Sequence, residues 1–363
     1  MSTVSSADRD WDNVLRGFER WHYQRWPGAH DVVVRMASET DAVRTNGFSS
    51  ESALIEVSWR TSEGEHSQGA VLRLPPAGAG VFPTYDLVRQ ARTMELARKH
   101  GIPAPEVFAV EEDPSYVGAP FLAMDLVPGR IPADEAPQYC VAGWLYEAGP
   151  DRQREFYLDF HDRLADIGAV ADTDGALDFL HRPQGPGLAG ELAWWLDYLD
   201  WATDGSPPAE MAEVADWLRG HLPAPAAPDA LIWGDARFGN MIVDDDFHVR
   251  AVLDWEMAGV GPAEVDLGWS FAIRRSIQLG NGLPLDAELP GFPDRAQTLD
   301  RYAQRLGRPL QSLDWYEVFA MLRMGAVLKS LSRLLTERGI TDHIVHTIPP
   351  LQDWIYDLME GRT

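Results

Sequence analysis

The sequence predicts an α+β protein of two parts, in which a small, mainly antiparallel β part precedes a larger helical part. Residues 31–128 contain β-like stretches separated by polar, glycine-bearing connections. After Gly129 the apolar residues recur mostly at helical spacing. The 363 residues suffice for one large or two medium domains with a substantial core. We therefore expect an N-terminal domain over residues 1–128 and a C-terminal domain over residues 129–363.

The N-terminal part is expected to begin with a helix over residues 8–26, because apolar side chains recur there at helical spacing before Pro27-Gly28. A second helix over residues 84–100 should end at Gly101. Short runs of β-branched and aromatic residues predict five strands, at residues 31–38, 52–59, 68–75, 105–112 and 119–127.

The C-terminal part is expected to be mainly helical, with one small β insertion after the Pro-rich connector 222–229. Within the insertion, short strands surround the segment WGDARFGN (233–240) and a turn at Asp244-Asp245-Asp246. The predicted helices span residues 151–170, 188–203, 209–221, 263–278, 294–306, 313–335 and 343–359.

Composition excludes several classes of protein. The net charge of −25 argues against a nucleic-acid binder and against binding to an anionic membrane, since both need clustered Lys and Arg. A single cysteine, Cys140, can form neither an internal disulfide nor a cysteine-based metal site. No signal-peptide pattern and no run of about 18 apolar residues is present, so we expect a cytoplasmic protein.

Three polar side chains carry the chemistry that the sequence suggests. Asp235 and Asn240 flank a short loop, and Asp254 follows the next predicted hairpin. Such a set suits phosphoryl transfer, in which one carboxylate orients an acceptor hydroxyl and takes its proton. An amide and a second carboxylate can hold the hard Mg²⁺ ions that bridge nucleotide phosphates.

These residues resemble the signature of the aminoglycoside phosphotransferase and choline kinase-like family, which has H-G-D-x-x-x-x-N, a hairpin, D-W-E and a downstream D-L. The chain carries Trp233-Gly234-Asp235, Asn240, Asp254-Trp255-Glu256 and Asp266-Leu267 in that order. The resemblance covers roughly residues 31–335 and is greatest to a bacterial branch of provisionally named aminoglycoside phosphotransferases. It implies a two-lobed, protein-kinase-like fold with ATP bound between a small β lobe and a larger helical lobe.

Residue by residue, the resemblance implies that Asp235 is the catalytic base and that Asn240 and Asp254 are the Mg²⁺ ligands. Asp266 is expected to hold the loop before Asn240 by hydrogen bonds. Arg73 stands where kinases keep a lysine on the nucleotide phosphates, and an arginine retains the charge and can bind phosphate oxygens in a bidentate way.

The remaining nucleotide contacts are also implied by the resemblance. Gln90 occupies the place of the helix glutamate that usually pairs with the lysine, so an amide contact would replace the ion pair, and Glu95 is the second candidate for that place. The segment TNGFSSES (45–52) is expected to cover the phosphates through backbone N–H groups near Gly47, Ser49 and Ser50. Backbone groups of the hinge, at Asp125 and Val127, are expected to face adenine.

The expected activity is Mg²⁺-dependent transfer of the γ-phosphoryl group of ATP to a hydroxyl of a small molecule. Aminoglycosides, other amino sugars, choline-like alcohols and hydroxy-acyl compounds remain open as acceptors. The Trp-rich helix near residues 191–201 is either a packing helix or part of a pocket for a cationic acceptor. The alternative function is a catalytically silent nucleotide-binding scaffold, because Arg73 and Gln90 replace the usual ion pair.

Overall fold

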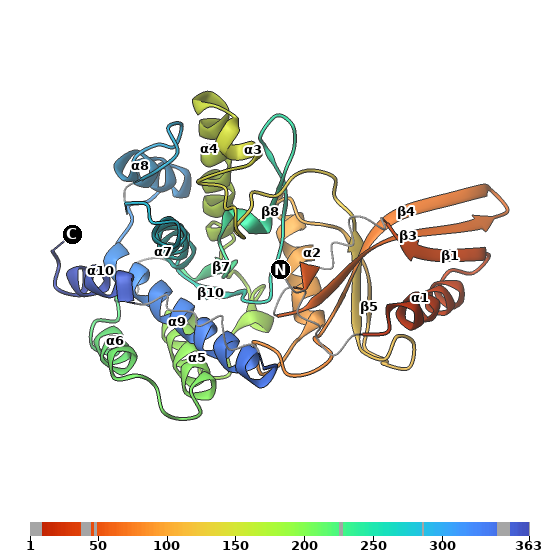
Figure 1. Ribbon diagram of the computed structural model, residues 1–363, viewed down its shortest axis with the longest axis horizontal. Helices are drawn as coiled ribbons and strands as arrows, with labels where there is room; N and C mark the ends of the chain where they lie inside the picture. The colour runs from red at the N-terminus through yellow and green to blue at the C-terminus, as the bar shows by residue number, and fades with distance from the viewer. Residues whose placement is uncertain are drawn as a thin grey trace. The chain divides into compact units, whose positions relative to one another are not determined.

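The computed structural model describes residues 9–37, 45–46, 49–224, 228–284, 287–339 and 349–362 (Figure 1). By its contacts the chain divides into two compact units. Unit 1 comprises Met1–Glu95, Pro105–Val127 and Arg333–Thr341, and unit 2 comprises Leu96–Ala104, Pro128–Ser332 and Asp342–Thr363. Unit 1 contains a sheet and unit 2 is mainly helical, so the predicted α+β class is confirmed.

The sheet of unit 1 is antiparallel throughout, with the order β1-β3-β4-β6-β5. Its five main strands are those predicted from the sequence, and a two-residue strand, β2 (Thr45–Asn46), adds to β3. The two longest strands, β3 and β4, are joined by a tight turn that ends at Gly64. The strand bounds are β1 (His30–Met36), β3 (Glu51–Thr61), β4 (Gly64–Leu74), β5 (Val107–Glu111) and β6 (Phe121–Asp125).

Two helices belong to this part of the chain, α1 (Trp11–Arg25) and α2 (Leu87–Lys99). Helix α1 lies beside β1 in Figure 1, and its buried apolar side chains belong to the same core as those of the sheet. Phe18 is fully buried there, with its ring 5.5 Å from that of Phe121 on β6. The apolar side chains whose helical spacing predicted α1 are therefore the ones that it contributes to the core of unit 1.

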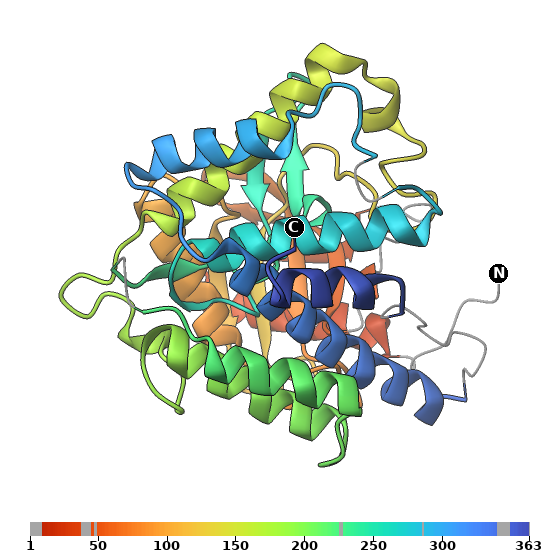
Figure 2. The same ribbon diagram turned by 90° about the vertical axis from the view of Figure 1, so that its left-hand side faces the viewer.

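Unit 2 is built from helices that surround the small β insertion (Figure 2). A four-residue helix, α3 (Trp144–Glu147), was not predicted, because it is too short to show a period. Part of the last predicted helix, residues 340–348, lies outside the described residues. The longer helices are α4 (Pro150–Gly168), α5 (Gly187–Ala202), α6 (Ala209–Gly220), α7 (Glu264–Gly280), α8 (Arg295–Leu306), α9 (Leu313–Glu337) and α10 (Pro349–Met359).

The β insertion consists of two short antiparallel pairs. Strand β8 (Met241–Val243) pairs with β9 (Val249–Val252) across the predicted aspartate turn, and β7 (Ala230–Ile232) pairs with β10 (Gly259–Gly261). The sequence did not predict β10, since its three residues, Gly-Val-Gly, carry almost no strand signal. The segment 233–240 leaves the end of β7 and returns into β8, so both pairs position it.

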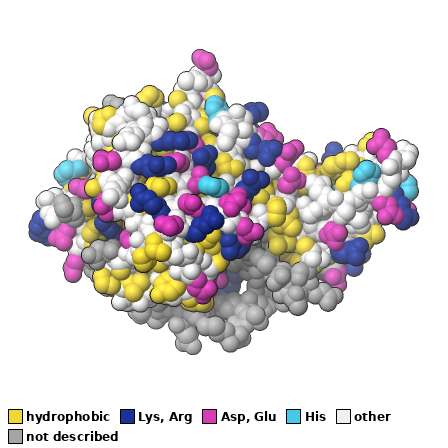
Figure 3. Space-filling model, turned by 90° about the horizontal axis from the view of Figure 1, so that it is seen from above, with side chains coloured by type: hydrophobic (Ala, Val, Ile, Leu, Met, Phe, Trp, Pro, Cys, Tyr) yellow, Lys and Arg dark blue, Asp and Glu magenta, His cyan; other side chains and the backbone are white. Residues whose placement is uncertain are grey.

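Ion pairs join α8 to α4 at the surface of unit 2. Arg301 and Arg305 on α8 each form a bidentate contact with an aspartate of α4, Asp162 and Asp166 respectively, at 2.7–3.0 Å. Figure 3 shows a face on which basic and acidic side chains alternate. On that face no continuous basic stripe of the kind that binds nucleic acid is visible.

Among the described helices, none is long and apolar enough to cross a bilayer.

His161 on α4 is packed inside unit 2, where it is not accessible to act as a general base. Its side chain is 1% exposed, its Nδ1 lies 2.8 Å from the Tyr157 carbonyl oxygen, and its ring contacts those of Tyr157 and Phe160. Burial lowers the pKa of His161 from 6.5 to about 3, and the nearby charge of Arg274 acts in the same direction. The imidazole is therefore neutral in the folded protein at neutral pH.

This burial predicts an acid-sensitive stability. Below pH 6.5, His161 is protonated in the unfolded chain. In the folded protein it stays neutral until the pH falls to about 3. This proton uptake by the unfolded chain alone should lower the free energy of unfolding by about 1.4 kcal/mol for each pH unit below 6.5. Burial also lowers the pKa of His22, which adds to the wild-type slope. Chemical denaturation between pH 6.5 and 5 should therefore show a slope in His161→Phe that is shallower than that of the wild type by about 1.4 kcal/mol per pH unit.

A matched control is His221→Phe on the exposed end of α6. His221 also places its Nδ1 2.8 Å from the carbonyl oxygen four residues earlier, and its ring stacks on an aromatic neighbour. Because His221 is exposed, its replacement should leave the pH slope as in the wild type. Equal slopes for His161→Phe and the wild type would contradict the assignment.

Candidate functional site

The 233–240 loop is held at its start by one buried carboxylate. Asp266 on α7 accepts the backbone N–H of Trp233 at its Oδ2 (2.7 Å) and that of Gly234 at its Oδ1 (2.8 Å). Burial raises the pKa of Asp266 to about 6, while the two N–H donors act against this rise. The predicted hydrogen bonds from Asp266 to the loop are confirmed.

Gly234 is required by two independent features of this turn. Its φ of +96° lies in the region that side chains disfavour. A Cβ at this position would also lie 2.3 Å from the carbonyl oxygen of Met257. The Gly-Asp pair of the sequence motif therefore has a structural reason, because the chain can turn sharply enough to present Asp235 only through a glycine.

Three N–H donors orient the carboxylate of Asp235. Its Oδ2 accepts from Asn240 Nδ2 (2.7 Å) and from Arg237 Nε (2.9 Å). Its Oδ1 accepts from the indole Nε1 of Trp269 on α7, at 2.9 Å. Each carboxylate oxygen can accept two hydrogen bonds, so Oδ2 is fully used and Oδ1 retains one acceptor position.

Asn240 and Asp254 are brought together by the strand pairing that follows the loop. The N–H of Leu253 donates to the carbonyl oxygen of Asn240 at 2.8 Å, one residue before Asp254. Asp254 adopts a φ of +58°, uncommon for a residue other than glycine. Its carbonyl oxygen, like that of Leu253, accepts from the indole N–H of Trp233, at 3.2 and 2.8 Å.

The chemistry of these groups fits a hard divalent cation. Asn240 donates through Nδ2, and its amide Oδ1 accepts no hydrogen bond from the described residues. An amide oxygen and a carboxylate are ligands that Mg²⁺ prefers. The structure thus gathers Asp235, Asn240 and Asp254, the three residues that the sequence singled out, around one loop.

Arg237 and Asp134 belong to this site, although sequence reasoning did not identify them. Asp134 Oδ2 accepts from Arg237 Nη1 (2.9 Å) and from the N–H of Gly239 (3.0 Å). Burial raises the pKa of Asp134 even though Arg237 lowers it, and this carboxylate's side chain is only 10% exposed. Burial alone would lower the pKa of Arg237, but the carboxylates of Asp235 and Asp134 outweigh it and raise the pKa.

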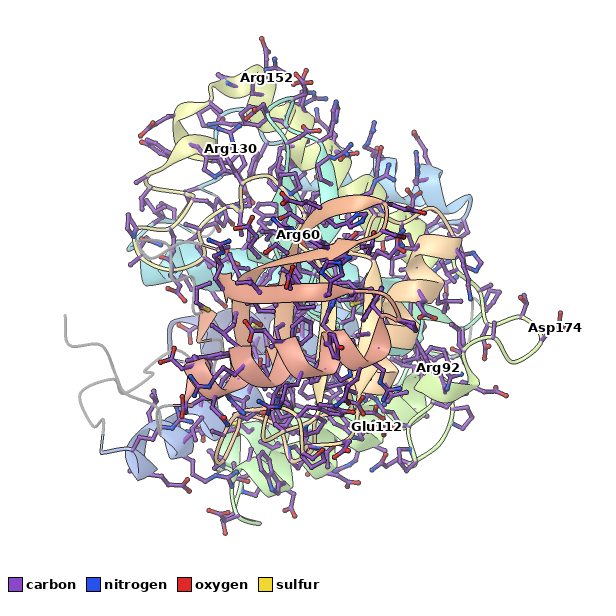
Figure 4. The ribbon with its side chains drawn as sticks, turned by 90° about the vertical axis from the view of Figure 1, so that its right-hand side faces the viewer. Arg60, Arg92, Glu112, Arg130, Arg152 and Asp174 are labelled. Atoms are coloured by element: carbon purple, nitrogen blue, oxygen red, sulfur yellow. The ribbon has the colours of Figure 1, made fainter. Side chains whose placement is uncertain are left out.

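The segment that carries Asp134 is attached to the β insertion by Arg130 (labelled in Figure 4). The backbone N–H and carbonyl of Arg130 both bond Val243 on β8, at 2.8 Å each. Its guanidinium lies 4.5 Å from the ring centre of Trp144. A basic residue two positions after Asp235 could have been noticed in the sequence, whereas nothing in the sequence marks Asp134.

The predicted phosphate contacts of unit 1 lie on its sheet and its second helix. Arg73 lies on β4, opposite Ser52 and Leu122 of the neighbouring strands, and Gln90 lies on α2. Both side chains are more than 90% buried. Ser50 is buried and Ser49 partly buried just before β3, while Gly47 lies outside the described residues.

The predicted hinge lies at the end of β6. The N–H of Asp125 donates to the Glu106 carbonyl oxygen at 2.9 Å, and its carboxylate accepts from Gln68 Nε2 at 2.7 Å. In the described part of the chain, the N–H of Val127 has no hydrogen-bond partner. The contact of the hinge to adenine remains a prediction. Because the N–H of Asp125 is already bonded to Glu106, the groups predicted to face adenine are the carbonyl of Asp125 and the N–H of Val127.

The Trp-rich helix α5 is mainly a packing helix. Trp195 is 1% exposed, Asp197 and Asp200 face solvent, and Trp194 is partly buried. Glu191 differs from Asp197 and Asp200 because its carboxylate is not exposed to solvent. It is buried and accepts from Arg182 Nε at 2.8 Å, and that guanidinium lies 4.2 Å from the ring centre of Trp194.

Sequence relatives of the chain include much longer proteins. It is 28% identical to acyl-CoA dehydrogenase family member 10 of Mus musculus over 267 residues, covering 72% of this chain and 24% of that protein. It is 31% identical to acyl-CoA dehydrogenase family member 11 of Gallus gallus over 205 residues, covering 56% and 25%. The chain thus spans about a quarter of the length of these curated relatives.

Solved structures share the fold. A provisionally named aminoglycoside phosphotransferase of Ralstonia eutropha superposes with a TM-score of 0.68 at 21% identity, covering 95% of this chain and 98% of that one. An ethanolamine kinase of Plasmodium vivax gives 0.55 at 10% identity, covering 92% and 83%. The two-lobed, protein-kinase-like fold expected from the motif is confirmed.

The family profile described as "phosphotransferase enzyme family" matches residues 56–316, which include every residue of the 233–240 loop as well as Asp254 and Asp266. The resemblance stated from the sequence motif is thereby confirmed. The chain belongs to the phosphotransferase enzyme family.

Proposed function

We propose that the protein transfers the γ-phosphoryl group of ATP to a hydroxyl of a small molecule, with Mg²⁺ as the metal. The observation that carries this proposal is the convergence of Asp235, Asn240 and Asp254 around the 233–240 loop. Membership of a phosphotransferase family supports the same reaction class. The net reaction converts ATP and an alcohol into ADP and a phosphate ester.

In this proposal Asn240 Oδ1 and the carboxylate of Asp254 hold Mg²⁺. The bound ion would supply neutralisation of phosphate charge, which phosphoryl transfer needs more than covalent help. The local charges suit a cation, because the carboxylates of Asp134, Asp235 and Asp254 all lie near the guanidinium of Arg237 and outnumber it. Arg73 and Gln90 of unit 1 would contact the nucleotide phosphates, as would the N–H groups near Ser49 and Ser50.

Asp235 would act as the base, and the hydrogen bonds indicate which atom takes the proton. Both acceptor positions of Oδ2 are occupied by Asn240 and Arg237. Within the described part of the chain, Oδ1 accepts only the Trp269 indole N–H, so the acceptor hydroxyl can donate to its remaining position. The acceptor hydroxyl is therefore expected to approach Oδ1.

The acceptor itself is to be found by screening for ADP release. The panel should contain aminoglycosides, other amino sugars, choline-like alcohols and hydroxy-acyl compounds. Hydroxy-acyl compounds have a specific reason, since the longer relatives are named acyl-CoA dehydrogenase family members. A single reproducible hit would define the acceptor class.

Replacing Asp235 with Asn should lower kcat by at least about a hundredfold, because an amide cannot take the hydroxyl proton. The rate would be measured by coupled ADP release with the acceptor found in the screen. The matched control is Asp246→Asn, which removes an exposed carboxylate from the β8–β9 turn. A wild-type rate in Asp235→Asn would exclude Asp235 as the base.

Replacing Arg73 with Met should raise KM for ATP by about tenfold or more, since a charge-assisted contact to phosphate is lost. Arg60→Met is the control, because Arg60 lies on the neighbouring strand β3 but is exposed. Initial rates at varied ATP would provide both KM values. If both variants bind ATP as the wild type does, Arg73 is not a phosphate contact.

A catalytically silent nucleotide-binding protein is the second candidate function. It is favoured by one observation, the buried glutamine at position 90 of α2, where kinases place the ion-pair glutamate. Thermal denaturation with ATP and Mg²⁺ should show stabilisation under both proposals. Phosphate transfer, or slow ATP hydrolysis without an acceptor, occurs only if the enzyme proposal holds.

A further inference from the structure

A fully buried arginine lies behind the 233–240 loop. Arg323 of α9 is 1% exposed, and its Nη2 donates to the carbonyl oxygen of Gly234 at 2.7 Å. Its Nε and Nη1 have no hydrogen-bond partner among the described residues. Burial lowers the pKa of Arg323 to about 10, and the carboxylates of Asp266 and Glu191 oppose this shift.

Such a side chain is costly to place in a core, because desolvating a guanidinium is unfavourable unless its donors are satisfied. Among the described residues, no carboxylate oxygen lies within 4.0 Å of the Arg323 guanidinium to form an ion pair with it. Replacing it by an apolar side chain would fill the same space without this cost. Its presence therefore indicates a role beyond packing.

The guanidinium of Arg323 lies against two tryptophan rings. Its guanidinium carbon lies 4.6 Å from the ring centre of Trp269 on α7 and 4.7 Å from that of Trp195 on α5. Both distances are within the range of a cation–π contact, which is stronger when the partners are desolvated. Both indoles are buried, at 3% and 1% exposure.

The two tryptophans differ in one respect that matters for the site. The indole N–H of Trp269 donates to Asp235 Oδ1, whereas among the described residues the indole N–H of Trp195 forms no hydrogen bond with Asp235, Asn240 or Asp254. Helices α7 and α9 are also closely packed here, since a Cβ on Gly268 would lie 2.7 Å from the backbone of Tyr316. Arg323 and Trp269 are thus held against each other by two rigid elements.

We propose that Trp269 and Arg323 are positioning residues for Asp235: the Trp269 N–H fixes Oδ1, and Arg323 holds both the indole plane and the Gly234 carbonyl. The inference rests on the proposed function, because it concerns the base of that reaction. Without the indole donor, the carboxylate of Asp235 keeps only the hydrogen bonds that Oδ2 accepts from Asn240 and Arg237. The carboxylate can then rotate about these two bonds. The oxygen that would receive the hydroxyl proton then loses its fixed place.

The two tryptophans provide a matched pair of variants. Trp269→Phe removes the N–H donor and keeps an aromatic face on Arg323, and Trp195→Phe makes the same change at the other ring that contacts the guanidinium. We expect kcat to fall by about tenfold to a hundredfold in Trp269→Phe, as for other lost donors at a reacting group. In Trp195→Phe, kcat should stay within about twofold of the wild type. KM for ATP should be unchanged in both.

If both variants lose kcat equally, or neither does, the indole N–H has no positioning role and the inference is overturned. A change confined to KM would overturn it as well. Should Trp269→Phe fail to fold, benzothienylalanine at position 269 keeps the bicyclic shape and replaces only the N–H by sulfur. The same loss of kcat is expected from that variant, and a wild-type kcat would refute the proposal.

Arg323→Lys tests the second half of the inference. A lysine keeps the charge but lacks the planar guanidinium that lies against two indoles. We expect a loss of kcat similar to that of Trp269→Phe, and no further loss when the two changes are combined, since both act through Asp235. Independent, multiplying losses would contradict a shared action.

The same measurements distinguish a failure of the positioning inference from a failure of the proposed function. If the wild type transfers no phosphate to any acceptor and does not hydrolyse ATP, the proposed function fails and Asp235 is not a base. If the wild type is active and Asp235→Asn is not, while Trp269→Phe equals Trp195→Phe, only the positioning inference fails.

Discussion

The site depends first on one carboxylate, that of Asp266, and on the two backbone N–H groups that it accepts. The chain turns sharply after β7, and this leaves the N–H groups of Trp233 and Gly234 without strand partners in a buried place. Unsatisfied, each would cost about 1–3 kcal/mol, so the carboxylate that pairs with both defines the start of the loop. Everything that follows, from Asp235 to Asn240, takes its position from that anchor.

A second constraint is the distribution of buried charge around the loop. The positive charges of Arg237 and Arg323 lie on opposite sides of Asp235, one on its Oδ2 and one behind the indole that contacts its Oδ1. Asp134 holds Arg237, and the rings of Trp195 and Trp269 contact Arg323. The carboxylate is therefore fixed from both ends by groups that themselves have little freedom, which is the arrangement that preorganised sites require.

Most of the fold could be predicted from the sequence, because its elements are long enough to show their periods. The five main strands of unit 1 and the helices of 11 or more residues all give repeated apolar positions. Among the strands and α-helices, those that escaped prediction are α3, β2 and β10, with four, two and three residues, too few to show any period. The motif residues Asp235, Asn240 and Asp254 were identifiable because their spacing along the chain is that of a loop and a hairpin.

By itself the sequence determined the α+β class, the family, and the set of side chains suited to phosphoryl transfer. Those properties depend on local spacing and on residue type. Only the tertiary structure decided that Asp134, Trp269 and Arg323 surround the same carboxylate, because they come from three segments separated from Asp235 by 34 to more than 100 positions. Contacts of that kind arise from how α7 and α9 pack against the loop, and no pattern along the chain records them.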